Sequence, residues 1–220
     1  RGTNFNFRTQ IGPLTATDPK GRTLEGSLVF SGSRYDPTRI NVKAKSNFKL
    51  EDIINFTEVL ADGTLDCISC FSSPELEFAG VVATSSSDQS ANEAYGKCSI
   101  DDVVFFGMPF RTASFDLAYV GSNLIFSNIV AKTSSDALVN AQALISMPGL
   151  SYDTASFSVE GTLNNGSLEE MMKIVDFQSE DRYRGTIKGK FHIESSMNSN
   201  LVSRLNGHGS FSISDGHLNQ

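Results

Sequence analysis

Three cysteines are the residues of this sequence best suited to redox or metal chemistry. Cys67 and Cys70 have the C-x-x-C spacing, and Cys98 follows further along the chain. A redox-active C-x-x-C opens a helix after a strand, whereas this pair lies in the alternating segment 63–71. A zinc site needs a second pair of Cys or His ligands, and the sequence supplies none. We interpret the cysteines as small strand residues, with a disulfide from Cys98 as the open alternative.

The histidines and carboxylates do not form a pattern typical of a catalytic site. General acid–base or nucleophilic catalysis needs a base beside a nucleophile. His192 falls at a polar strand position, and His208 and His217 flank the last predicted strand. The adjacent carboxylates Asp101 and Asp102 are interpreted as a turn. We therefore expect a protein that is not an enzyme and uses neither a cofactor nor a metal.

The composition favours a folded, strand-rich protein that does not bind nucleic acid. The 220 residues include 16 Phe and no Trp, and the formal net charge is -7. A protein that neutralises phosphates needs a basic face, but the 18 Lys and Arg residues are scattered. The densest basic stretch, 182–190, also alternates as a strand does, so we interpret it as a solvated strand face.

Alternation of apolar and polar residues predicts strands along most of the chain. Successive side chains of a strand point to opposite faces, so a two-residue period gives one dry face and one wet face. This pattern is typical of an antiparallel sheet that is covered on one side at most. The clearest segments are 39–44, 114–119, 156–160, 186–193 and 210–214.

Two segments, 50–60 and 167–175, have helical spacing instead. Ser167 is a suitable N-cap, and Glu170 three residues later completes a capping box. Both helices are short, and we expect each to lie against one end of the sheet.

Part of the sequence recurs in the same order. Tyr35-Asp36 matches Tyr152-Asp153, and the segments 50–54 and 63–65 match 168–172 and 185–187. Gly96 to Asp102 then matches Gly209 to Asp215. A nearly constant offset predicts a structural unit that is used about twice, and stacked units of this kind share one core. We expect a first unit at 1–105 and a second at 106–220, joined in one continuous sheet.

The end of the sequence resembles a family of bacterial envelope proteins. Residues 205–218 have a leucine, a G-x-G, an alternating strand, a D-G and a final leucine. This stretch is similar to a pattern found in AsmA/TamB-like proteins, and the segments 107–110, 115–119 and 124–130 resemble their middle strands. The likeness covers most of residues 25–220 and is carried by glycines and alternation.

The resemblance implies a mainly β fold, an extended and curved antiparallel sheet (a β-taco or groove) with two short helices. It further implies a periplasmic protein, held at the inner membrane by an N-terminal helix outside these 220 residues. Its apolar groove would bind and conduct phospholipid acyl chains toward the outer membrane, with outer-membrane assembly proteins as further candidate partners. The residues we expect to line the groove are Ile40, Val42, Leu65, Phe115, Leu117, Phe126, Phe157, Val159, Ile187, Phe191, Phe211 and Ile213.

A second hypothesis needs no ligand. A strand pattern with one apolar face is also typical of an ordinary closed core, as in a structural or adhesive β-sandwich or β-solenoid. In that case, the apolar side chains would be sealed between two sheets, and a charge placed among them would be buried without a partner.

Overall fold

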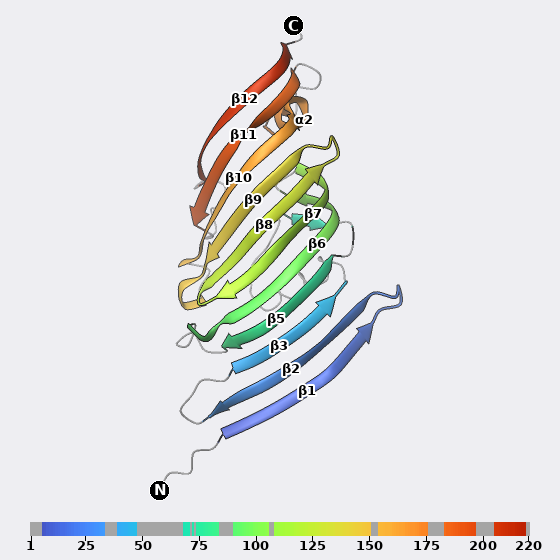
Figure 1. The fold of residues 1–220 in the computed structure, drawn as a ribbon, viewed down its shortest axis with the longest axis vertical. Helices are drawn as coiled ribbons and strands as arrows, with labels where there is room; N and C mark the ends of the chain where they lie inside the picture. Colours follow the sequence, from blue (N-terminus) through green and yellow to red (C-terminus); the bar gives the residue numbers. More distant parts are fainter. Residues whose placement is uncertain are drawn as a thin grey trace.

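In the residues that the structure describes, the chain forms one antiparallel sheet of 12 strands. The computed structural model describes residues 6–33, 39–47, 68–70, 72, 74–83, 90–105, 108–150, 154–175, 183–196 and 205–218. Eleven strands follow one another across the sheet in sequence order, and β4 pairs with an extended end of β6. Figure 1 shows this ladder, with the N-terminus beyond β1 and the C-terminus beyond β12.

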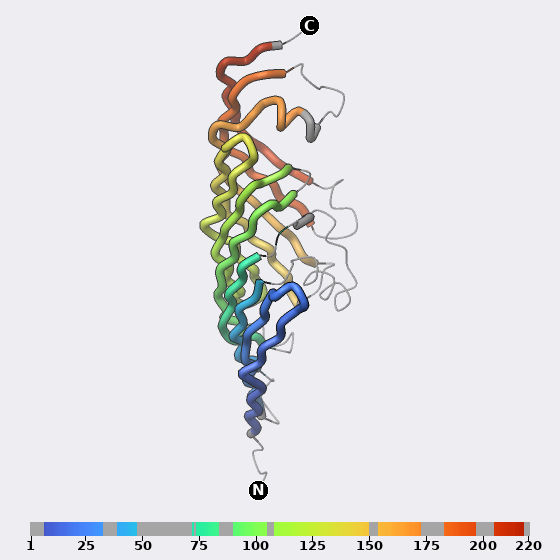
Figure 2. The backbone as a smooth tube through the Cα atoms, turned by 90° about the vertical axis from the view of Figure 1, so that its right-hand side faces the viewer, coloured from blue at the N-terminus to red at the C-terminus, as the bar shows by residue number. Residues whose placement is uncertain are grey.

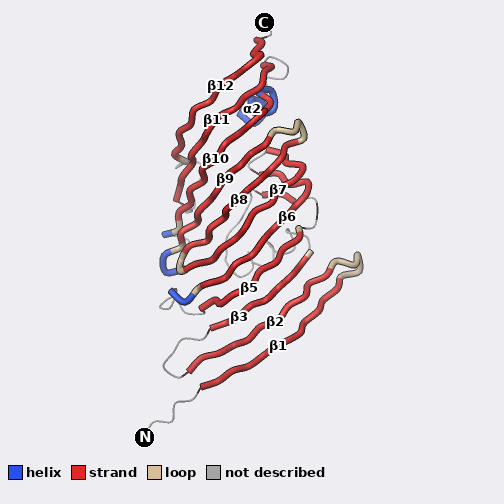
Figure 3. The backbone as a smooth tube through the Cα atoms, in the orientation of Figure 1, coloured by secondary structure: helices blue, strands red, loops and turns tan. Residues whose placement is uncertain are grey.

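The strands are long, and short connections join most neighbours (Figure 3). Their bounds are β1 Asn6–Thr17, β2 Thr23–Ser33, β3 Arg39–Ser46, β4 Ile68–Cys70, β5 Glu75–Ala83, β6 Glu93–Phe105, β7 Met108–Val120, β8 Asn123–Thr133, β9 Leu138–Ser146, β10 Ser156–Ser167, β11 Tyr183–Ser196 and β12 Asn206–Leu218. A short 3-10 helix, η2 (Pro148–Leu150), lies between β9 and β10, and the helix α2 (Leu168–Val175) follows β10 directly.

Polar side chains in the turns fix the hairpin geometry. Asp18 Oδ1 accepts hydrogen bonds from the N–H groups of Lys20 and Arg22, both at 2.9 Å, and so closes the β1–β2 turn. Gly121 opens the two-residue β7–β8 turn with φ 61°, as the tight turns of hairpins require. The buried Asn92 joins this turn to the end of β5, since it donates to the Gly121 carbonyl and accepts from the Ala83 N–H.

The helix expected at 167–175 is present, and its N-cap is the predicted one. The Ser167 hydroxyl oxygen accepts a hydrogen bond from the Glu170 N–H at 3.2 Å. The Glu170 carboxylate accepts from the Ser135 hydroxyl at 2.7 Å, on the β8–β9 turn. The capping residues therefore also tie α2 to a neighbouring hairpin, at one end of the sheet.

Four strands contain an Asp or Asn with a left-handed backbone, and the strand register shifts beside three of them, Asn128, Asn165 and Asp215. The four residues are Asp102 in β6, Asn128 in β8, Asn165 in β10 and Asp215 in β12, with φ between 50° and 55°. Asp and Asn tolerate this region better than other residues with a Cβ atom. The expected turn at Asp101 and Asp102 is wrong, because both residues lie within β6.

The mainly β, antiparallel character of the sequence prediction is confirmed. The sheet is open and uncurled, and seen from the side it is a single layer with α2 on one surface (Figure 2). The helix expected at 50–60 lies outside the described residues, and so does Cys67. Cys98 is a buried strand residue of β6. The division at residue 105 and the use of one unit about twice stay predictions.

Candidate functional site

The strand registers separate the side chains into two faces. Directly paired residues of neighbouring strands point to the same side, and successive residues alternate. One surface, called here the apolar face, carries no charged side chain away from the bulges and strand ends. The opposite surface, the polar face, carries the Lys and Glu residues of the strands together with some apolar side chains such as Ile125 and Leu144.

One row of paired residues crosses the whole apolar face without a polar side chain. This central row uses one residue from each of the eleven consecutive strands. At a strand spacing of about 4.8 Å, it is roughly 50 Å long. Its members are Leu14, Gly26, Ala44, Phe78, Gly96, Leu117, Phe126, Ala143, Val159, Ile193 and Gly207.

Aromatic rings on the apolar face lie over glycines of the neighbouring strand. A Cβ atom built on Gly161 would lie 2.8 Å from Cζ of its cross-strand partner Phe191. A Cβ on Gly96 would lie 3.0 Å from the ring of its own partner, Phe78. Because glycine has no side chain to fill this space, the rings lie close against the sheet. The apolar face is therefore lined by ring surfaces and small residues.

The apolar face is packed most tightly at one end of its strands. Under α2, Ala137, Leu163 and Ile187 are buried, and Leu168 and Met171 of the helix pack against them. Toward the other end and the two edge strands, the large apolar side chains are partly or largely exposed. Phe115 and Phe126 meet there edge to face, with ring centroids 5.4 Å apart.

Eleven of the twelve residues expected to line a groove share the apolar face; Leu65 lies outside the described residues. They come from β3, β7, β8, β10, β11 and β12. One of them needs a correction: Ile187 is 6% exposed and belongs to the cluster under α2, so it is part of a packed core.

Other residues of the same face were not predicted from the sequence. Ile11, Leu28, Phe78, Leu124 and Ile145 occupy equivalent positions in the register. Leu28, Leu124 and Ile145 each have an adjacent apolar residue on the polar face, so alternation alone does not assign them, and Ile11 lies beside the register shift of β1. Tyr119 also lies on this face, where burial raises the pKa of its hydroxyl.

On the polar face, a row of charges alternates in sign across five neighbouring strands. Glu25, Lys45, Glu77, Lys97 and Asp116 are paired in succession from β2 to β7. Lys45 Nζ lies 3.0 Å from Glu77 Oε1. Opposite charges directly across from one another form favourable cross-strand pairs.

The polar face also carries a pair of neighbouring histidines. His192 and His208 are cross-strand partners with ring centroids 5.1 Å apart, and His192 Nε2 lies 3.5 Å from Glu194 Oε2. Within the described parts of the chain, no three His, Cys, Asp or Glu side chains are grouped as metal ligands.

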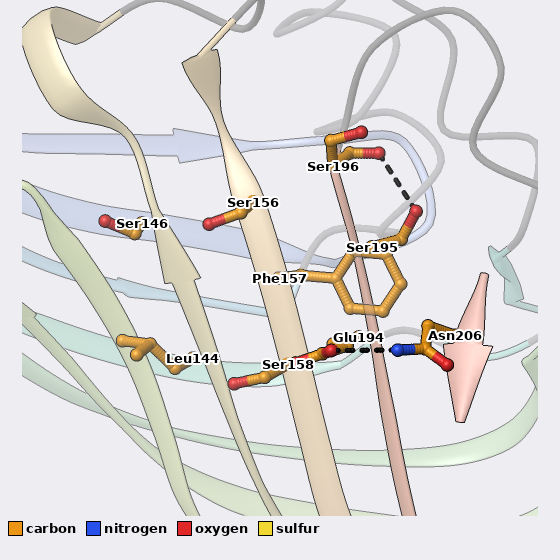
Figure 4. Close-up of a pocket in the computed structure, with 9 residues that line it drawn as sticks. All are labelled: Leu144, Ser146, Ser156, Phe157, Ser158, Glu194, Ser195, Ser196 and Asn206. Atoms are coloured by element: carbon orange, nitrogen blue, oxygen red, sulfur yellow. Dashed lines mark hydrogen bonds between the residues drawn. The ribbon is translucent and has the colours of Figure 1, made fainter. Parts of the chain in front are cut away.

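A shallow pocket of about 420 Å³ lies where β9 and β11 end beside the starts of β10 and β12 (Figure 4). Phe157 reaches it from the apolar face. The polar side of the pocket includes Asn206, whose Nδ2 donates to Glu194 Oε1 at 3.1 Å. Its other lining residues are Leu144, Ser146, Ser156, Ser158, Ser195 and Ser196. Most of the lining therefore belongs to the polar face, and Phe157 and Ser195 come from the apolar face.

None of the helices in the described ranges has the length and hydropathy of a membrane span. The chain matches no protein-family model, no curated protein and no solved structure.

Proposed function

We propose that this protein binds the acyl chains of phospholipids along its apolar face and conducts them within the bacterial cell envelope. The observation that carries the proposal is the central row, which crosses eleven strands without a polar side chain. An apolar surface of this extent on one side of an open sheet is unusual for a protein that meets only water.

The dimensions suit acyl chains. The hydrocarbon core of a bilayer is about 30 Å thick, so one layer of chains is about 15 Å long. The central row, at roughly 50 Å, offers room for about three chains end to end. Its lining of rings, aliphatic side chains and glycines provides no polar group that would select a particular chain.

The energetics favour lipids with two chains. Full burial of a CH₂ group contributes about 0.8 kcal/mol, and contact with one flat surface about half of that. About ten contacting methylenes then contribute on the order of 4 kcal/mol, which corresponds to a Kd of about 1 mM. Two chains lying side by side would reach the micromolar range. We therefore expect diacyl phospholipid to bind and single-chain lysophospholipid to bind weakly.

A place in the envelope is part of the same proposal. It is supported by the likeness of residues 205–218 to AsmA/TamB-like proteins, whose sheets present an apolar surface in the periplasm. The same resemblance is the basis for three further parts of the proposal, which are a trough-like curvature of the sheet, a membrane anchor and outer-membrane partners.

The proposal is tested by changing one residue of the apolar face. Phe157→Asp places a carboxylate where the acyl chains would lie, and desolvation of that charge opposes lipid binding. Protein extracted gently from a bacterial host should carry phospholipid, measured by mass spectrometry, and Phe157→Asp should reduce the lipid bound per protein at least tenfold.

The matched control is Thr162→Asp, further along β10 on the polar face, where Lys190 lies directly opposite the new carboxylate. It should leave the amount of bound lipid unchanged. Circular dichroism checks that both variants keep the strand signal. Lipid-free wild-type protein, or equal loss in both variants, would contradict lipid binding and favour a structural role for the sheet.

A further inference from the structure

The strand β12 is an edge of the sheet with a strongly exposed apolar side. Among the described strands it pairs with β11 alone. Phe211 is 48% exposed and Ile213 is 53% exposed, although both point to the apolar face. The backbone groups on the free side of β12 can therefore pair with an additional strand. The apolar side chains of β12 have no neighbouring strand on that side.

Natural edge strands are usually protected against pairing by lysines, prolines, bulges or inward-pointing charges. The other edge of this sheet has such protection, because the register of β1 shifts between Ile11 and Leu14, and Pro13 at this shift has no N–H to donate. The sequence of β12 contains no Lys, Arg, Glu or Pro, and its bulge at Asp215 lies near its C-terminal end. The segment 206–214 is unprotected.

The pairing of β11 with β12 shows which strand fits beside β12. Both strands contain the pattern G-x-F-x-I, at 189–193 and 209–213. They pair so that Phe191 lies opposite Gly209 and Phe211 lies opposite Gly189. The ring of Phe211 occupies the space that a Cβ atom on Gly189 would fill. Each phenylalanine thus lies opposite a glycine.

This pattern is complementary to itself, and we propose that a second copy of the chain pairs with β12 through its own β12. In the antiparallel register centred on Ser210, Phe211 of each copy lies opposite Gly209 of the other, as Phe191 does within one chain. Ile213 lies opposite Gly207, as Ile193 does in β11. The β12 of the second copy thus pairs with the free side of the first β12 in the same way that β11 pairs with its other side.

The symmetry of this pair has a structural consequence. Its two-fold axis is perpendicular to the sheet, so the apolar faces of the two copies lie on the same side. The Ile213 of the second copy lies opposite Gly207, so the row of paired residues runs on from there to that copy's Ile187, which α2 covers. The inference concerns association of the protein and does not require bound lipid.

The decisive substitution is Ser210→Asp. Ser210 lies opposite Lys190 in β11, so the new carboxylate gains an oppositely charged partner within its own chain. At the two-fold axis, however, it lies directly opposite its own copy, and like charges in this position are destabilising. Sedimentation velocity over a concentration series should show a monomer–dimer equilibrium for the wild type. For Ser210→Asp the dimer dissociation constant should be at least tenfold higher, so that the variant sediments as a monomer.

The matched control is Ser212→Asp, which also gains a lysine partner, Lys188, but lies opposite His208 of the second copy in this register. It should still form dimers. An equimolar mixture of Ser210→Asp and Ser210→Lys should restore a dimer that neither forms alone, because only the register centred on residue 210 brings the two charges together. A monomeric wild type at every concentration, a dimer insensitive to Ser210→Asp, or a mixture that stays monomeric would overturn the proposal.

Discussion

Single residues on the polar face show how little an exposed ion pair contributes to stability. Lys45 and Glu77 are both well exposed, so solvent and salt screen their attraction, and it contributes little to overall stability. Both belong to an alternating row of five charges, in which each charged side chain has an opposite charge directly across from it.

The charge row makes a prediction about protonation. Lys45 donates a hydrogen bond to Glu77 and, with Lys97 and Lys43, lowers the pKa of that carboxyl below its ordinary value of 4.5. The pair therefore stabilises the fold above pH 4.5, and this contribution is lost as the pH falls through the lowered pKa. In a carboxyl NMR titration, Lys45→Met should raise the pKa of Glu77 toward 4.5, and added salt should do so in the wild type.

The control for this titration is Lys132→Met, which removes a lysine of β8 that lies outside the charge row. It should leave the pKa of Glu77 unchanged. A Glu77 pKa that did not respond to Lys45→Met would show that the pair is not formed in solution.

Alternation alone could assign single residues to a face only between bulges. Phe157 and Val159 are two residues apart in an uninterrupted stretch, and their common face could be predicted. Phe126 and Ile129 are three residues apart, with Asn128 as a bulge between them, so counting by two fails there. The burial of Ile187 under α2 depends on a contact that no local pattern contains.

At the scale of elements, α2 shows how a helix and the sheet are connected. Ser167 ends β10 and caps the helix, while Glu170 extends the contact to the β8–β9 turn. The N-cap at Ser167 could be predicted because its spacing is local. The bond to Ser135 could not, because the two residues are 35 positions apart in the sequence.

Removing the cap should weaken this end of the sheet. Ser167→Ala leaves the Glu170 N–H without its hydroxyl acceptor, and loss of an N-cap typically costs about 1 kcal/mol. We expect a decrease of that size in the free energy of unfolding, measured by urea denaturation. Ser167→Asp keeps an acceptor and should cost much less; equal losses in both variants would show that the cap is not the cause.

For the whole molecule, the sequence predicted a continuous antiparallel sheet but could not distinguish one sheet from two facing sheets. Alternation is the same in both cases, because it records only that one face avoids water. The described residues form one sheet, and α2 covers one end of its apolar face. What an apolar surface of this size contacts is therefore the central question about the protein.

Photo-crosslinking tests that question most directly. Benzophenone-bearing phenylalanine would replace Phe126, a member of the central row, or Tyr95, which is 54% exposed on the polar face. After irradiation in a bacterial host, mass spectrometry should find phospholipid adducts at position 126 and none at position 95. Equal adducts at both positions, or none at position 126, would contradict lipid binding by the apolar face.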